Sequence, residues 1–147
     1  MFPDEILNTM LFTNAHYNTI NEQKEKVVVL PLGAIEQHGP HLSVSTDTDI
    51  VTTVALLAEK RLKDDILLCP TLPFGSSHHH LAFGGTMSVS VETYIRFVTE
   101  LVESLIQNGF RRIVLLNGHG GNITPVKQVL SMLSNQYDVT HQPNIAL

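Results

Sequence analysis

Three short apolar runs, separated by stretches with helical periodicity, constrain the fold of this chain more than any other feature. They cover residues 26–30, 66–70 and 112–116 and are rich in Val, Ile and Leu. Runs of this length and composition are typical of strands that are buried on both faces of a sheet. Strands that alternate with helices along the chain form a parallel sheet with helices on both sides. The sequence therefore predicts an α/β domain with a mostly parallel sheet.

Three other stretches repeat their apolar residues at the spacing of an amphipathic helix. They are residues 48–63, a stretch that begins after the N-cap Ser90 and ends before Gly109, and a stretch that starts near Pro125. The first of these stretches opens with Thr48 and Asp49, residue types that favour the N-terminus of a helix. The last is expected to bury Val126, Val129, Leu130, Leu133 and Tyr137. The opening residues 1–23 are interpreted as a helix, followed by a loop, with one face formed by Ile6, Met10 and Leu11.

Composition excludes several classes of protein. The chain has 147 residues, 43% of them hydrophobic, and a net charge of −5. These values indicate one globular domain with a sizeable core and no surface for nucleic acid or another polyanion. The single cysteine, Cys69, excludes an internal disulfide, favours a reducing compartment and is expected to lie in the core. Because the sequence contains no membrane-spanning run and no signal peptide, we expect a cytoplasmic protein.

The residues that could bind a metal ion follow the predicted strands. Glu36, His38 and Asp47 lie in the loop after the first strand, and His119 follows the third. The carboxyl ends of parallel strands meet at one edge of a sheet, where open α/β folds bind their ligands. Glu36 and His38 are two residues apart, so on an extended segment they point to the same side. Two carboxylates and two imidazoles suit Zn²⁺ or Mn²⁺ better than Ca²⁺ or Mg²⁺.

Each of these features also has a simpler interpretation. A carboxylate at position 47 could bridge two cations, or it could only cap the helix that follows. At least two members of the tract at residues 78–80, His-His-His, are expected to be solvated loop residues. Gly120 and Gly121 could form a phosphate-binding nest, which would make the protein an anion-binding module. Against that alternative, the loop lacks a basic residue, and Glu36 and Asp47 would add negative charge at the same edge.

Three blocks of the sequence resemble the creatininase (creatinine amidohydrolase) family. They are EQHGPHL followed by TD, then HLAFGGTMS, then NGHGGN, and together they reach from about Val27 to the last helix. The resemblance implies a three-layer α/β/α sandwich and a two-metal site for Zn²⁺ or Mn²⁺. It further implies hydrolysis of a non-peptide or cyclic C–N amide bond in a small-molecule substrate, and assembly as a homo-oligomer.

The same resemblance implies roles for individual residues. Glu36 and His38 would each bind one metal ion, Asp47 would bridge both, and His119 would complete the ion bound by Glu36. A hydroxide activated by the two ions would attack the amide carbonyl, since bound cations lower the pKa of water. His41 or His80 would orient the substrate or move a proton.

The chain also departs from the family pattern. Creatininase proper carries a glutamate ligand two residues after the histidine of the third block, where this chain has Gly121. Relatives with GHGGN take that glutamate from a later segment that is absent here. Residues 1–147 are therefore expected to form a single creatininase-like domain, the N-terminal part of the family fold, with four of five ligands. The chain contains no Trp, a residue that creatinine-specific members use, so creatinine itself is not supported as the substrate. A truncated homologue that keeps the fold without activity is the alternative.

Overall fold

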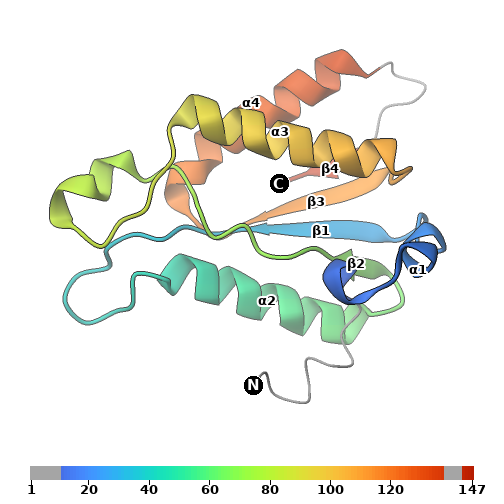
Figure 1. The fold of residues 1–147 in the computed structure, drawn as a ribbon, viewed down its shortest axis with the longest axis horizontal. Coiled ribbons are helices and arrows are strands. Elements are labelled where there is room, and N and C mark those ends of the chain that lie inside the picture. Colours follow the sequence, from blue (N-terminus) through green and yellow to red (C-terminus); the bar gives the residue numbers. More distant parts are fainter. Residues whose placement is uncertain (1–10, 138–143) are drawn as a thin grey trace.

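Four parallel strands form a single sheet at the centre of the molecule, in the order β2-β1-β3-β4 (Figure 1). The structure is a computed structural model that describes residues 11–137 and 144–147. The strands are β1 (Val27–Leu32), β2 (Ile66–Leu68), β3 (Arg112–Asn117) and β4 (Asn144–Ala146). The first three confirm the predicted runs. The fourth was missed, because only three residues form it and Ile145 is its only large apolar side chain.

Helices cover both faces of this sheet and produce the three layers of an α/β/α sandwich. Figure 1 shows α2 (Thr46–Leu62) on one face, and α3 (Val91–Gln107) with α4 (Ile123–Gln136) on the other. The short α1 (Tyr17–Asn21) and three 3₁₀ helices, η2 (Phe12–Asn14), η3 (His78–Phe83) and η4 (Gly120–Asn122), complete the secondary structure of the described residues. The arrangement confirms the expected fold class.

The predicted boundaries of α3 are confirmed, whereas α2 and α4 each begin two residues before the residue named in the sequence. The Ser90 side chain accepts a hydrogen bond from the Thr93 backbone N–H, and Gly109 adopts a φ of 94° just after the helix. Both features agree with the predicted N-cap and C′ glycine. The start expected at Thr48 was wrong, since α2 begins two residues earlier. Similarly, α4 begins at Ile123 rather than Pro125, because a proline fits anywhere in the first turn of a helix.

The main core lies between the sheet and the pair α3 and α4. Its fully buried members include Tyr94, Val98 and Phe110, and Leu133 contributes from α4. A smaller cluster, Val29, Ala55, Ile66 and Leu68, lies beneath α2. On α4, Val126 and Val129 are buried as predicted, whereas Leu130 and Tyr137, the residue just after the helix, pack against the core from partly buried positions.

Two further expectations concern Cys69 and the start of the chain. Cys69 is buried after β2, and burial raises the pKa of its thiol to about 12. It is the core residue that its apolar surroundings predicted.

Of the predicted opening helix, Ile6 and Met10 lie outside the described residues, and Leu11 forms an isolated bridge with Leu68. Within the described part of the chain, no helix combines the length and apolar character needed to cross a membrane.

Candidate functional site

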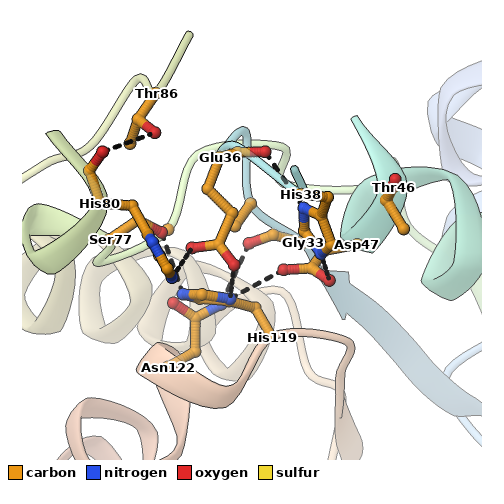
Figure 2. A network of polar contacts seen from close by, with 12 residues as sticks. Gly33, Glu36, His38, Thr46, Asp47, Ser77, His80, Thr86, His119 and Asn122 are labelled. Atoms are coloured by element: carbon orange, nitrogen blue, oxygen red, sulfur yellow. Dashed lines mark hydrogen bonds and ion pairs between the residues drawn. The ribbon is translucent and has the colours of Figure 1, made fainter. Parts of the chain in front are cut away.

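The carboxyl ends of the central strands carry a cluster of carboxylates and imidazoles, drawn in Figure 2. The loop after β1 contributes Glu36 and His38, the first turn of α2 contributes Asp47, and His119 follows β3. Because β1 lies between β2 and β3 in the sheet, its loop opens at the centre of this edge. The structure thus brings together the four residues predicted to bind metal.

Asp47 connects two imidazoles that come from opposite ends of the site. Its Oδ1 lies 3.2 Å from His38 Nε2, and its Oδ2 lies 2.8 Å from His119 Nδ1. The carboxylate therefore points at the cluster and does not cap α2, whose N-cap residue is Ser45. With one oxygen directed at each ring, Asp47 lies between the two imidazoles, and its role as a metal bridge stays a prediction.

Glu36 is the most buried acid of the cluster, with 6% of its surface exposed. Its Oε1 lies 3.5 Å from His119 Nδ1, and its Oε2 lies 3.8 Å from His80 Nε2. Oε2 is buried and has no hydrogen-bond partner among the described residues. A buried carboxylate oxygen without a partner is costly, and a bound cation is the kind of group that compensates it. The donor set therefore fits a divalent metal ion.

The rings of His38 and His119 are each held by one nitrogen and present the other to the carboxylates. His38 Nδ1 lies 3.1 Å from the Glu36 backbone oxygen, a hydrogen bond that, together with nearby Asp47, raises the pKa of His38. His119 Nε2 lies 3.0 Å from Ser77 Oγ and 3.3 Å from the Ser76 carbonyl oxygen. Metal-binding histidines are typically oriented in this way by an acceptor on the second nitrogen.

The structure separates the two histidines predicted to orient substrate or move a proton. His80 faces the cluster from η3, and its Nδ1 lies 2.8 Å from Gln37 Nε2. The other amide atom, Gln37 Oε1, accepts a hydrogen bond from the Gly39 N–H, so Nε2 donates to His80. His41 is exposed and, in the described chain, takes part in none of the contacts that build the cluster.

Sequence reasoning missed Asn122, which is fully buried and ties the strand-end loops together. Its Nδ2 donates to the Gly33 carbonyl oxygen at 3.0 Å, and its Oδ1 accepts from the Ser76 N–H at 3.1 Å. Asn122 is the last residue of the NGHGGN block, whose position after a strand was the available signal.

Of the tract at residues 78–80, His78 and His79 are exposed, as expected for at least two of its members. His79 nevertheless lies near the cluster, since Glu36, His79 and His80 have ligand atoms within 4.8 Å of one another.

The region around Gly121 does not suit an anion. A Cβ atom on Gly121 would meet the Ser76 carbonyl oxygen and His119 Nε2. The space beside this glycine is thus filled by an oxygen and a ring, and the carboxylate of Asp47 contacts the same ring. Neighbouring negative groups oppose phosphate binding, so no observation favours the anion-binding module.

The fold and the cluster define an α/β protein with a candidate divalent-metal site at its strand ends. Comparison with protein families identifies it further: residues 11–146 match the model described as "Creatininase: Creatinine amidohydrolase", and the chain belongs to the creatininase family.

Curated relatives agree with this assignment. The chain is 37% identical over 114 residues to the mycofactocin precursor peptide peptidase of Mycobacterium tuberculosis (strain CDC 1551 / Oshkosh), covering 72% of this chain and 45% of the relative. It is 34% identical over 101 residues to the creatinine amidohydrolase of Pseudomonas putida, covering 65% of this chain and 38% of the relative. The matched region thus spans less than half the length of either relative.

Solved structures share the fold. A crystal structure of creatinine amidohydrolase (creatininase) superposes with a TM-score of 0.81 at 25% identity, covering 95% of this chain and 57% of that chain. A manganese form of creatininase gives a TM-score of 0.80 at 25% identity, with 95% and 58% covered. A zinc–zinc form of a creatininase mutant gives 0.79 at 24% identity, with the same coverage.

Proposed function

We propose that this protein is a metal-dependent amidohydrolase that cleaves a non-peptide or cyclic C–N amide bond of a small molecule. The observation that carries the proposal is the convergence of two carboxylates and two oriented imidazoles on one buried site. The matched relatives support hydrolysis of a C–N bond, because they include an amidohydrolase and a peptidase, and the creatinine amidohydrolase supports a non-peptide substrate.

In this proposal Glu36, His38, Asp47 and His119 hold divalent cations, Zn²⁺ or Mn²⁺ as in the related creatininase structures. The chemistry that such ions supply is polarisation of the amide carbonyl and a lower pKa for the attacking water. Asp47 would serve both cations, because one of its oxygens faces His38 and the other faces His119.

The remaining residues position these groups and handle a proton. Gln37 donates to His80 Nδ1, so the neutral ring carries its proton on Nε2, the nitrogen that faces Glu36. His80 is therefore placed to orient a substrate or hold a proton at Nε2. Through its hydrogen bonds to Ser76 and Gly33, Asn122 fixes the positions of the loops that carry these groups relative to one another. His41 would act only on a substrate that extends into its exposed loop. We also propose that the protein works in the cytoplasm as a homo-oligomer.

The proposal is tested by loading the purified protein with Zn²⁺ or Mn²⁺ and assaying a panel of cyclic amides, formamides and short peptides for hydrolysis, which forms a new amino group and a carboxylate, on one molecule where the amide is cyclic. We expect turnover of at least one non-peptide amide, abolished by chelation and by Asp47→Asn. Cleavage of peptides alone would disprove the stated substrate class. A protein that binds metal but hydrolyses no member of the panel would support the alternative of a homologue without activity.

A further inference from the structure

Glu36 directs its two carboxylate oxygens to different groups. Oε1 lies 3.5 Å from His119 Nδ1, on the side of Asp47, whereas Oε2 lies 3.8 Å from His80 Nε2 (Figure 2). Asp47 and His119 belong to the cluster of four predicted metal ligands. The Oε2 side, with His80 and the neighbouring His79, has no part in the metal site that the family resemblance implies.

The separation on the Oε2 side suits a shared cation better than a direct hydrogen bond. At 3.8 Å the two atoms are too far apart for a hydrogen bond. Two ligand atoms that are each about 2.0–2.2 Å from one zinc ion lie roughly 3.3–3.6 Å apart in a tetrahedron. The buried Oε2 atom also lacks any hydrogen-bond partner within the described residues. An ion between Oε2 and His80 would supply the missing partner after a small shift.

Position 121 cannot supply a ligand to a further ion. The Cβ of any side chain there would meet the Ser76 carbonyl oxygen and His119 Nε2, so only glycine fits without rearrangement. The histidines of η3 are closer candidates, since Glu36, His79 and His80 offer ligand atoms within 4.8 Å of one another.

We propose that Glu36 Oε2, His79 and His80 form a further cation position, in addition to the two ions that Asp47 would bridge, so that Glu36 joins it to the position of Asp47 and His119. Two imidazoles and one carboxylate are a donor set of catalytic zinc sites, and three protein ligands leave one coordination position open for water or substrate. The inference rests on the proposed function and deepens it by assigning the residues that hold an additional ion.

Gln37 controls whether His80 can accept this ion. The Gln37 amide now donates to Nδ1, which places the proton of the neutral ring on Nε2, the nitrogen that would bind the cation. Binding therefore requires the Gln37 amide group to rotate so that its oxygen accepts from Nδ1–H, at the expense of its hydrogen bond from Gly39. Nε2 cannot hold a proton and bind an ion at the same time, so the proton role proposed above belongs to the protein without this additional ion. A carboxylate at position 37 would accept from both N–H groups at once, so Gln37→Glu should favour the cation.

The test is metal stoichiometry, measured by elemental analysis after dialysis against Zn²⁺ and by calorimetric titration with Zn²⁺. We expect His79→Ala and His80→Ala each to bind one ion fewer than the unmodified protein. His78→Ala is the matched control, because His78 is exposed on the same short helix but contacts Ser88 instead. It should leave the stoichiometry unchanged. If all three variants lose Zn²⁺ equally, the tract binds metal nonspecifically and the inference fails.

Gln37→Glu gives an independent measurement. We expect the affinity for the additional Zn²⁺ ion to rise about tenfold, the size of effect that partners of metal-binding histidines produce. Gln37→Leu, which removes the donor and supplies no acceptor, should not raise it. Unchanged affinity in Gln37→Glu would contradict the assignment of His80.

The outcome also separates this inference from the proposed function. If His79→Ala retains every ion of the unmodified protein while hydrolysis requires Asp47, the proposed position at His79 and His80 is wrong and the proposed function stands. If the η3 variants lose one ion but the loaded protein cleaves no amide, the position is real and the proposed function is wrong.

Discussion

Asp47 and His119 are 72 residues apart in the chain, yet their side chains lie 2.8 Å apart. The contact forms because β1 and β3 are neighbours in the sheet: His119 follows the carboxyl end of β3, and the loop after β1 leads into α2, whose first turn carries Asp47. A carboxylate is needed at position 47, since only its two equivalent oxygens can face His38 and His119 together. At the scale of single residues, the site depends on the charge of Asp47 more than on its role in the helix.

Substituting Asp47→Asn should therefore weaken Zn²⁺ binding strongly while leaving the fold intact. We expect affinity to fall by about 100-fold or more, since a neutral amide is a poor bridge between cations. The free energy of unfolding should change by no more than about 1 kcal/mol, because the side chain makes no capping bond. Calorimetric titration with Zn²⁺ and urea unfolding measure the two quantities.

Asp49→Asn is the matched control, because Asp49 lies in the same first turn but only accepts a hydrogen bond from Ser45. It should retain full metal affinity. Equal losses in both variants would show that the helix terminus, and not the Asp47 bridge, attracts the ion.

Cys69 provides a second test at this scale. Burial raises the pKa of its thiol to about 12, so at pH 8 to 9 the folded protein should carry the unreactive protonated form. Unfolding returns the pKa to the ordinary value of about 8.5, where the thiolate is abundant. A chromogenic disulfide reagent should thus react at pH 8.5 only after urea is added. Rapid reaction of the native protein would mean that Cys69 is accessible and not part of the core.

At the scale of secondary-structure elements, the turn from β3 into α4 packs closely against other parts of the site. A Cβ on Gly118 would lie 2.6 Å from Val51 Cβ on α2, and Asn122 bonds to two other loops. The 3₁₀ helix η4 therefore packs against several elements at once, which holds His119 in place.

Gly121→Ala should destabilise the protein, whereas Gly120→Ala should not. The added methyl at position 121 would meet the Ser76 carbonyl oxygen and the His119 ring, but the one at position 120 meets nothing within 4 Å. Overpacking of this kind costs about 1–3 kcal/mol. Urea denaturation of both variants measures the difference. Equal stability would show that the loop after β2 moves away freely and that η4 is not rigidly packed.

Gly121 is required by the close approach of another segment and not by the conformation of its own backbone. A positive φ is the usual reason for a glycine in a loop, but Gly121 is not among the described residues with positive φ, which are Gly39, Gly84, Gly85 and Gly109. Gly121 is instead required by the close approach of Ser76, which comes from the loop after β2. No pattern along the chain shows such a contact between distant segments.

At the scale of the whole molecule, α2 presents apolar side chains to solvent as well as to the sheet. Ile50, Val54 and Leu57 are 56%, 49% and 50% exposed and recur at helical spacing on one side of the helix. Exposed apolar stripes of this kind promote association. The expected homo-oligomer would be consistent with burial of this stripe.

The double variant Ile50→Glu, Val54→Glu should therefore lower the tendency of the protein to self-associate. Sedimentation velocity over a range of concentrations measures the change, with Thr53→Glu as a control on the adjacent exposed position. If the double variant associates as strongly as the unmodified protein, another surface mediates the contact.

The sequence alone determined the layer architecture of this protein and which carboxylates and imidazoles meet at its strand ends. Short β-branched runs and helical periods are local properties, so β1, β3 and α3 can be recognised from the order of their residues. The parallel order of strands then predicted that Glu36 and His119 would meet, because parallel strands end at a common edge.

Only the tertiary structure decided how the site is held and which further residues it includes. Asn122 and Gln37 act through hydrogen bonds between segments up to 89 and 43 residues apart, and His79 joins the cluster through the position of η3. Such contacts depend on the packing of loops against one another. Loop packing leaves no periodic signal in the sequence, because it follows from the distances between elements that only the folded chain establishes.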